Sequence, residues 1–323
     1  MTLAAGMGGE LNRGHASGSG RVAILLSTFN GERWLEEQLR GYLTQTHADW
    51  RLYWRDDGSS DRGEALVRDF ARVAGPGRCL RHEEAAHLGA AGSFLALLRM
   101  ALGDDAAYFA FSDQDDVWLP RKLAHGVAAL NTVPAGQPAL YFCNRVLVDA
   151  ALRPLGPAPA PRRPLGFPAA LTQNVIPGCC MILNRAAAAL IDANTAPEGT
   201  WHDWWAYIVV SAAGGAIIGE DSADILYRQH TTNLVGEPRD FWRRVFGVMQ
   251  RGRGPFMGQF WRHVEALRAH PAVLSRHASG LLRVIEKARG GGPWTRLRAL
   301  FLPGFVRQRR METFLFRLWF LLG

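Results

Sequence analysis

Several features that mark other protein classes are missing from this sequence. No GxGxxG follows the first strand-like run, so the fingerprint of dinucleotide-binding proteins is absent. No stretch reaches the roughly 20 apolar residues that a membrane-spanning helix needs. The N-terminus lacks a basic region followed by an apolar one, so we expect no secretory signal. The four cysteines (Cys79, Cys143, Cys179 and Cys180) have no zinc-ligand spacing, which favours a reduced, cytosolic setting.

Charge is distributed unevenly along the 323 residues. The net charge is +8, but residues 239–323 hold 17 Lys and Arg against 4 Asp and Glu, whereas residues 1–238 hold 20 against 25. The sequence therefore predicts a mildly acidic first part and a strongly basic tail. Such a tail suggests an anionic partner, which could be a membrane surface, a nucleic acid or an acidic substrate.

Short apolar runs alternate with segments of helical periodicity. We expect strands at 22–26, 50–55, 78–81, 106–111, 139–148, 181–183 and 225–227. Between them we expect helices at 34–43, 65–70, 89–98 and 119–130, one from 185 and one from 203 to 212. This alternation predicts an α/β fold with a mainly parallel sheet.

Three polar turns follow strands in the first half of the chain. They are Ser27-Thr28-Phe29-Asn30-Gly31-Glu32, Asp56-Asp57-Gly58-Ser59-Ser60-Asp61 and Asp113-Gln114-Asp115-Asp116. Ligands normally bind at the carboxyl ends of strands in such a sheet. The three clustered carboxylates of the third turn repel one another, so a divalent cation with oxygen ligands fits there. A solvated acidic loop is the alternative for this turn, and a plain turn with a helix cap is the alternative for 57–61.

The second half offers a further carboxylate and a proline-rich segment. Asp203 lies at the start of a helix in His202-Asp203-Trp204-Trp205, where capping alone would also favour an acidic residue. Six prolines between 153 and 168 predict an exposed loop, which either shapes an acceptor site or varies freely on the surface.

The tail segments 241–246, 294–301 and 314–322 combine helical periodicity with basic residues. They are too short to cross a bilayer and fit an interfacial anchor. The alternative is a helical subdomain packed on the core.

Taken together, six ordered blocks resemble the family 2 glycosyltransferases, and among them the rhamnosyltransferase-like bacterial members. The blocks are Ser27–Glu32, Arg55–Asp61, Asp113–Trp118, Gly178-Cys179-Cys180, His202–Trp205 and Tyr227-Arg228-Gln229-His230. The resemblance covers about residues 21–236. Two positions depart from the family pattern: His87 stands where Asn is usual, and Cys180 where Thr is common.

The resemblance implies a GT-A fold and inverting transfer from a nucleotide-activated sugar. Thr28, Phe29, Asn30 and Glu32 would hold the nucleoside, and Asp57 would hydrogen-bond the pyrimidine ring. Asp113, Asp115 and His230 would serve a Mg²⁺ or Mn²⁺ ion and the diphosphate, and Asp203 would be the catalytic base. Gly178, Trp204 and Trp205 would face the acceptor.

The expected partners are a dTDP or UDP sugar, with L-rhamnose suggested by the resemblance, and a glycan or lipid-linked acceptor. We expect a disordered leader at 1–20 and a transferase domain at 21–236, divided into nucleotide (21–130) and acceptor (131–236) halves. A helical basic tail at 237–323 would lie at the inner face of the plasma membrane, making the protein cytoplasmic and peripheral.

Three other functions fit the sequence less well. A nucleotidyltransferase normally has a Gly-rich basic loop after the first strand, whereas Ser27–Glu32 contains no Lys. A catalytically weak scaffold that binds nucleotide or glycan would not need all of Asp57, Asp113, Asp115 and Asp203. Nucleic-acid binding by the tail is disfavoured because its apolar residues recur at helical spacing rather than forming a flat stacking surface.

Overall fold

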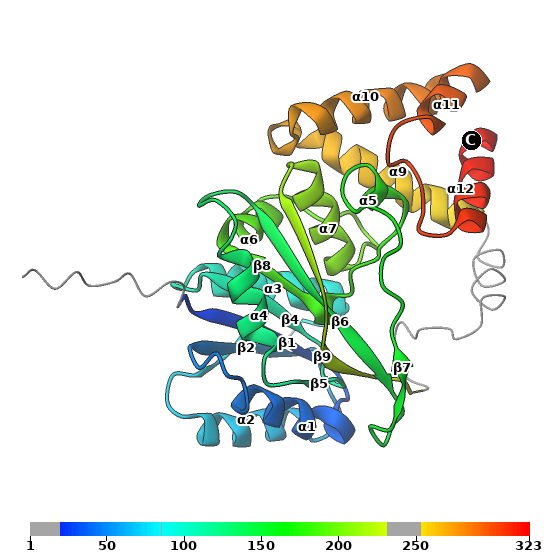
Figure 1. The fold of residues 1–323 in the computed structure, drawn as a ribbon. Coiled ribbons are helices and arrows are strands. Elements are labelled where there is room, and N and C mark those ends of the chain that lie inside the picture. Colours follow the sequence, from blue (N-terminus) through cyan, green and yellow to red (C-terminus); the bar gives the residue numbers. More distant parts are fainter. Residues whose placement is uncertain (1–19, 85, 231–252) are drawn as a thin grey trace, which may run out of the picture.

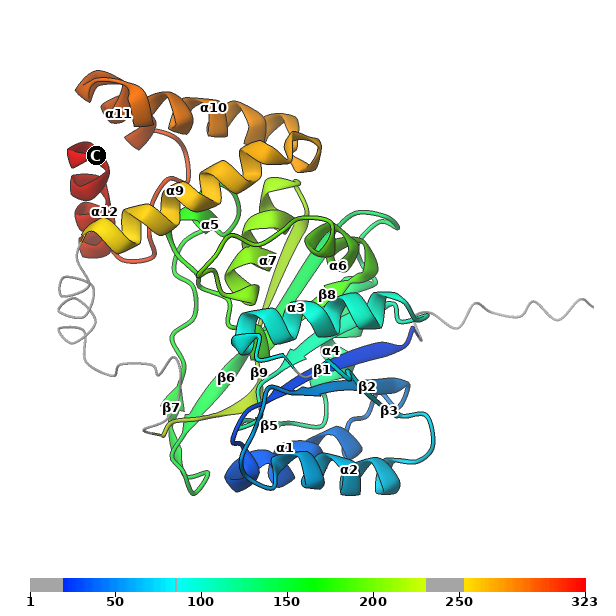
Figure 2. The same ribbon diagram turned by 180° about the vertical axis from the view of Figure 1, so that it is seen from behind.

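The computed structural model describes residues 20–84, 86–230 and 253–323. In this part of the chain a nine-stranded sheet has the order β3-β2-β1-β4-β8-β6-β9-β5, with β7 paired to β6. Helices α1 and α2 cover one face of its first half and α3 covers the other, while α9–α12 form a separate layer at one end (Figures 1 and 2). The expected α/β fold with a helical C-terminal extension is confirmed.

The first half is a set of strand–helix units. Its elements are β1 (Val22–Thr28), α1 (Glu32–Leu43), β2 (Trp50–Asp56), α2 (Gly63–Ala74), β3 (Cys79–Arg81), α3 (Gly89–Leu102) and β4 (Tyr108–Ser112). Their strands pair in parallel, with Thr28 opposite Asp56 and Leu26 opposite Ser112. Because parallel strands end at the same edge, this register brings the three polar turns together.

The second half joins the same sheet through an antiparallel strand. Its elements are β5 (Val117–Trp118), α4 (Lys122–Leu130), β6 (Ala139–Val148), β7 (Pro154–Pro157), α5 (Ala169–Thr172), η1 (Gly178–Cys180), β8 (Met181–Asn184), α6 (Arg185–Asp192), α7 (His202–Ala212) and β9 (Ala216–Arg228). Strand β8 runs antiparallel to both β4 and β6. The short strand β5 pairs with β9, which places the acidic turn beside the end of β9.

Three boundaries differ from those expected. The helix expected at 119–130 begins at Lys122, because Val117 and Trp118 form a strand against Leu226 and Ile225. Strand β9 begins nine residues before the expected 225, and exposed polar residues in its middle hide it from an apolar-run criterion. The proline-rich segment contains β7, which pairs with the end of β6.

The C-terminal helices pack on the second half of the sheet domain. They are α9 (Arg253–Ala269), η2 (Pro271–Val273), α10 (Arg276–Gly290), α11 (Pro293–Leu300) and α12 (Arg310–Leu322). Their own core contains Phe260, Phe305, Phe316 and Phe320, each nearly or fully buried. Burying such side chains contributes about 1.5–3 kcal/mol each.

Polar contacts fix this helical layer to its neighbours. Arg307 donates to the Thr172 carbonyl at 2.7 Å, and the Thr172 hydroxyl donates to the Val306 carbonyl at 2.9 Å. The Ser275 amide, at the start of α10, donates to the Ala212 carbonyl at the end of α7. The described part of the tail therefore forms a helical layer that packs on the sheet domain.

The leader at 1–20 lies almost wholly outside the described residues, as does the tail segment at 241–246. Within the described ranges, no helix is both long enough and apolar enough to cross a bilayer.

Candidate functional site

The turn after β1 is held by hydrogen bonds from the turn after β2. The Asn30 side-chain oxygen accepts from the Ser60 amide at 2.9 Å, and the Glu32 amide donates to Asp61 at 2.8 Å. Buried Thr28 donates from its hydroxyl to Asp56 at 3.0 Å. Asn30 has a positive φ of 48°, a conformation that Asn tolerates better than most residues. The two turns thus form one preorganised loop cluster.

Gln114 ties the acidic turn to the same cluster. Its side-chain oxygen accepts from the Phe29 amide and its NH₂ donates to the Phe29 carbonyl, both at 2.9 Å. A Cβ on Gly31 would lie 2.2 Å from the Gln114 side-chain oxygen, so this close approach requires glycine. Sequence reasoning gave Gln114 no role, because the middle residue of the acidic turn carries no signal of what it pairs with.

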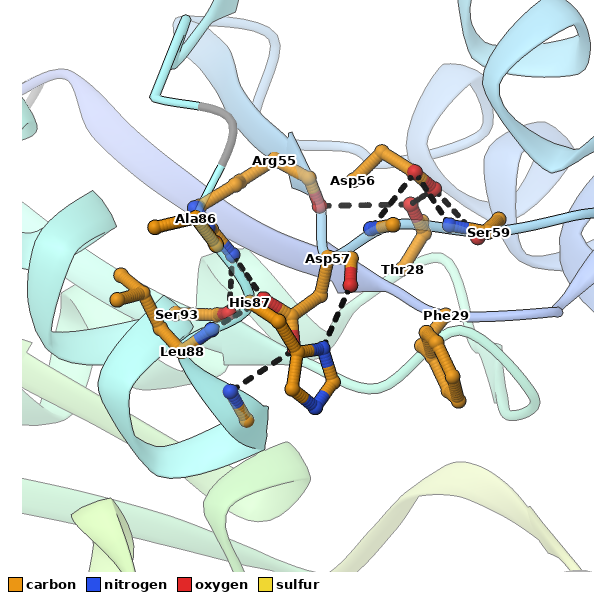
Figure 3. A network of polar contacts seen from close by, with 12 residues as sticks. Thr28, Phe29, Arg55, Asp56, Asp57, Ser59, Ala86, His87, Leu88 and Ser93 are labelled. Atoms are coloured by element: carbon orange, nitrogen blue, oxygen red, sulfur yellow. Dashed lines mark hydrogen bonds and ion pairs between the residues drawn. The ribbon is translucent and has the colours of Figure 1, made fainter.

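Asp57 lies beneath this cluster in a buried network with Arg55 (Figure 3). One Asp57 oxygen accepts from the Leu88 amide at 2.8 Å and from the Arg55 guanidinium, and the other accepts from the Gly89 amide at 2.9 Å. Burial raises the pKa of Asp57, but the Leu88 amide and the Arg55 charge outweigh it, so the pKa is lowered overall. Asp57 therefore stays ionised and holds the start of α3 against the end of β2.

Phe29 and His87 are exposed beside Asp57, and their rings contact each other (Figure 3). Their ring centroids are 5.5 Å apart and the planes are tilted by 56°. The His87 Nδ1 lies 2.8 Å from the Asp57 carbonyl, which orients the ring. Two aromatic rings beside an ionised carboxylate make a surface on which a planar heterocycle can stack.

The acidic turn itself joins β4 to β5. The Asp115 carboxylate lies 2.8 Å from the His230 Nε2, which comes from the end of β9. The pKa of Asp113 is raised to about 8, first by burial and then by the negative charges of Asp115 and Asp203. Asp116 is fully buried and its pKa is also raised, first by burial and then by Asp115. Such a cluster favours a positive charge nearby.

The donor set around the turn fits a divalent cation. One carboxylate oxygen from each of Asp113 and Asp116 and the Sγ of Cys179 all lie within 4.8 Å of one another. Among the residues that the structure describes, none hydrogen-bonds the buried Oδ2 of Asp116. Asp115 and His230 supply a further carboxylate and an imidazole. Carboxylate oxygens and imidazole nitrogens are ligands that Mn²⁺ and Mg²⁺ accept in proteins.

Arg228 locks the acidic turn in place. Its guanidinium is 1% exposed and donates to the Asp115 carbonyl at 2.9 Å, the Ala150 carbonyl at 2.7 Å and Glu37 at 2.6 Å. It also stacks on Trp34, whose other contacts include the His230 ring at 5.4 Å. Sequence reasoning missed this role, because Arg228 and Glu37 are 191 residues apart.

Asp203 lies in the first turn of α7 with both oxygens oriented. Its Oδ2 accepts from the Gly178 amide at 3.0 Å and its Oδ1 from the Trp204 amide at 2.6 Å. Burial raises the pKa of Asp203 to about 6, although bonds from Asn174 and the two amides lower it. Cys179, the residue after Gly178, has its Sγ within 4.8 Å of carboxylate oxygens of Asp113 and Asp116, so the η1 turn links Asp203 to the acidic turn.

Gly178 and His202 shape the floor behind Asp203. A Cβ on Gly178 would lie 2.5 Å from the His202 Nε2, so glycine is required there. His202 packs between Phe94 and Phe111, with centroid distances of 4.1 and 4.6 Å. Burial lowers the pKa of His202 to about 3, so the ring is neutral.

The two tryptophans after Asp203 point in different directions. Trp205 is fully buried, and its Nε1 donates to the Asn194 carbonyl at 2.9 Å. The expectation that Trp205 faces the acceptor is therefore corrected, because its ring lies in the core. Trp204 is half-buried, donates to the Ala170 carbonyl at 2.7 Å and packs against His263 of α9. Of the two, Trp204 alone keeps an accessible part.

The chain was compared with known proteins. Residues 23–190 match the family model described as "Glycosyl transferase family 2". The dTDP-rhamnosyl transferase RfbG of Shigella flexneri is 27% identical over 224 residues, which are 65% of this chain and 73% of that protein. The UDP-Glc:alpha-D-GlcNAc-diphosphoundecaprenol beta-1,3-glucosyltransferase WfgD of Escherichia coli is 35% identical over 104 residues, 32% of this chain and 38% of that one.

Solved structures support the fold. A structure of S. aureus TarS residues 1–349 in complex with UDP-GlcNAc superposes with a TM-score of 0.55. The superposition covers 87% of this chain and 84% of that one at 12% sequence identity. At this identity the likeness shows the fold alone.

Proposed function

The chain belongs to glycosyl transferase family 2, and from this premise we propose that it is an inverting enzyme that extends a cell-surface glycan. It would transfer a sugar from a nucleotide diphosphate to an acceptor hydroxyl. The observation that carries the proposal is that the η1 turn links Asp203, at the start of α7, to the acidic turn after β4. The Gly178 amide donates to Asp203, and the Cys179 Sγ lies within 4.8 Å of carboxylate oxygens of the acidic turn. One site thereby contains a carboxylate able to take a proton and a carboxylate cluster able to hold a cation.

The surface formed by Phe29, His87 and Asp57 is proposed as the nucleoside site. The base would lie against the Phe29 and His87 rings, and the turn of Thr28, Asn30 and Glu32 would line the ribose side. The side-chain oxygens of Asp57 already accept from backbone amides, so its contact with a pyrimidine would share an occupied carboxylate. Similarity to RfbG and WfgD supports a dTDP or UDP sugar, with L-rhamnose as the first candidate.

Asp113, Asp115 and His230 are proposed to hold Mg²⁺ or Mn²⁺, with Asp116 and Cys179 next to them. Such an ion would neutralise the charge that develops on the departing diphosphate. Arg228 fixes the Asp115 backbone from behind, so the turn is oriented before any ligand arrives. Preorganisation of this kind lowers the cost of binding.

Asp203 is proposed as the general base. With a pKa raised to about 6 it is ionised at neutral pH, yet basic enough to accept a proton. The acceptor oxygen forms a bond to the anomeric carbon while the bond to the diphosphate oxygen breaks, and the proton moves to Asp203. A single displacement inverts the anomeric centre and needs one carboxylate base.

The acceptor is proposed to be a glycan, either free or linked to a lipid. Trp204 and the Gly178 turn lie beside Asp203, where an acceptor ring would stand. We propose that the protein works in the cytoplasm, peripheral to the inner face of the plasma membrane, and that its basic tail binds no nucleic acid.

A panel of nucleotide sugars tests the proposal. Release of nucleoside diphosphate should be fastest with one dTDP or UDP sugar, should require Mg²⁺ or Mn²⁺ and should stop in excess chelator. Nucleotide binding without release for any donor would instead indicate a scaffold. Full activity in chelator would show that the acidic turn is structural.

A further inference from the structure

Helices α11 and α12 both carry exposed large apolar side chains, and the surface that these residues form is called the α11–α12 face. Trp294 and Phe301 at the two ends of α11 are 82% and 78% exposed, and Phe314 of α12 is 61% exposed. Leu297, Met311, Leu318, Leu321 and Leu322 add to the same set of exposed large apolar side chains. Spacings of three and four residues place 311, 314, 318 and 321 along one side of α12. Large apolar side chains that are exposed close to one another on a protein surface are typical of a binding site.

Basic side chains flank these aromatic residues at helical spacing. Exposed Arg298 lies four residues after Trp294 and three before Phe301. Exposed Arg310 and Arg317 lie four before and three after Phe314. Between residues 293 and 323 the sequence has six arginines and one acidic residue, Glu312. The face is therefore cationic as well as apolar.

The two helices are fixed to each other. Arg296 of α11 donates to the Leu321 carbonyl at the end of α12 at 2.9 Å. Arg317 of α12 donates to the Leu300 carbonyl at the end of α11 at 3.4 Å. On their inner side, Phe316 and Phe320 pack into the core of the helical layer. The exposed residues are thus held on a firm support, and in both views α11 and α12 lie together at the end of the molecule away from β1–β3 (Figures 1 and 2).

We infer that this α11–α12 face is a docking surface for an anionic lipid bilayer. Aromatic and leucine side chains enter the boundary between headgroups and acyl chains, while flanking arginines reach the phosphates. A second protein copy would bring the same arginines together, which its own charge disfavours. The inference rests on the proposed function only for the lipid-linked acceptor. The docking surface and the proposed transfer reaction can be disproved separately.

Vesicle flotation of the full chain tests the inference. The protein should float with vesicles containing phosphatidylglycerol, float weakly with phosphatidylcholine alone and be released by salt. The triple variant Trp294→Ser, Phe301→Ser, Phe314→Ser should lose at least about ten-fold in vesicle affinity. The matched control is Val73→Ser on α2, which removes a 73% exposed apolar side chain elsewhere and should float like the wild type.

A charge variant separates the two contributions. Arg298→Gln with Arg310→Gln should weaken binding to anionic vesicles by about five-fold for each arginine. The control Arg72→Gln, an exposed arginine of α2, should leave flotation unchanged. Melting curves that match the wild type would show that each variant is folded.

Three outcomes would overturn the inference. The first is that the wild-type protein does not float with vesicles, and the second is that the triple aromatic variant floats as well as the wild type. The third is that the protein forms a concentration-dependent dimer that the triple aromatic variant abolishes. Donor turnover measured on the same samples separates the two proposals. If the wild-type protein releases nucleoside diphosphate but does not float, the lipid-docking inference fails and the proposed function stands. If it floats but releases no nucleoside diphosphate from any donor, the proposed function fails and the lipid-docking inference stands.

Discussion

At the scale of single residues, a buried ion pair lies beneath the proposed nucleoside site at Phe29 and His87. The Arg55 and Asp57 side chains are at most 3% exposed, and each has further partners in the network of Figure 3. If Asp57 contacted only a ligand, its substitution would not change the stability of the free protein. In this arrangement Asp57 also joins the end of β2 to the start of α3, so it stabilises the fold.

Replacing Asp57 by Asn should therefore lower the free energy of unfolding by about 3–5 kcal/mol, because Arg55 would be left buried without its charge partner. Denaturant unfolding measures this, with Asp69→Asn on the exposed side of α2 as control. Because the folded pKa of Asp57 is lowered, its contribution is complete above the ordinary value of 3.8 and is lost as the pH falls through the folded value. Unchanged stability would limit Asp57 to ligand binding.

The pH dependence of transfer follows from Asp203. Since the carboxylate must be ionised to accept a proton and burial raises its pKa to about 6, kcat/KM should fall about ten-fold per pH unit below 6. Initial rates from pH 4.5 to 8 would measure this, with melting curves to confirm that the protein stays folded. A flat profile across about pH 6 would exclude Asp203 as the group that titrates.

At the scale of elements, the site depends on how the end of β9 meets the acidic turn. Pairing of β5 with β9 brings Arg228 and His230 to Asp115. Arg228 binds the turn through its backbone carbonyl, so it acts as a positioning residue rather than as a ligand contact.

Replacing Arg228 by Ala should loosen the turn and raise the metal concentration needed for half-maximal activity by about ten-fold or more. Arg228→Lys should restore little, since one ammonium cannot replace three guanidinium contacts. The exposed Arg68→Ala on α2 serves as control. If the Arg228→Ala protein needed no more metal than the wild type, the positioning role would be wrong.

The sequence predicted the elements that make the site better than the contacts inside it. Apolar runs followed by polar turns identified β1, β2 and β4, because buried parallel strands leave a strong local pattern. Gln114, Arg55 and Arg228 were missed, since their partners are set by long-range register. Trp205 was misassigned because successive helical residues differ by about 100° in direction, and the buried side of α7 could not be read from two adjacent tryptophans.

At the scale of the whole molecule, the helical layer supports the start of α7, which carries Asp203. Trp204 follows Asp203 directly, and His263 of α9 packs on its ring at 4.7 Å. Gln259 and His263 also bond to Thr200, just before α7. The helical layer therefore belongs to the transferase structurally, although the domain boundary at 236 remains a prediction.

Truncating Phe260 tests how strongly the core of the helical layer stabilises the protein. Phe260→Ala removes a ring that is 1% exposed and contacts four aromatic neighbours, so the loss of stability should be about 3–5 kcal/mol. Phe301→Ala, which removes an exposed phenylalanine of the same layer, should change stability little. Calorimetry of both variants checks this, and equal melting temperatures would contradict the packing described.

The central claim is that one site combines a cation-holding acidic turn with Asp203 as the base. Its most direct test is single-turnover transfer by Asp203→Asn with the preferred donor, alongside donor affinity from titration calorimetry. We predict a rate about 10²–10⁴-fold lower with donor affinity within a few-fold of the wild type. Transfer at the wild-type rate by the folded, donor-bound variant would contradict the account.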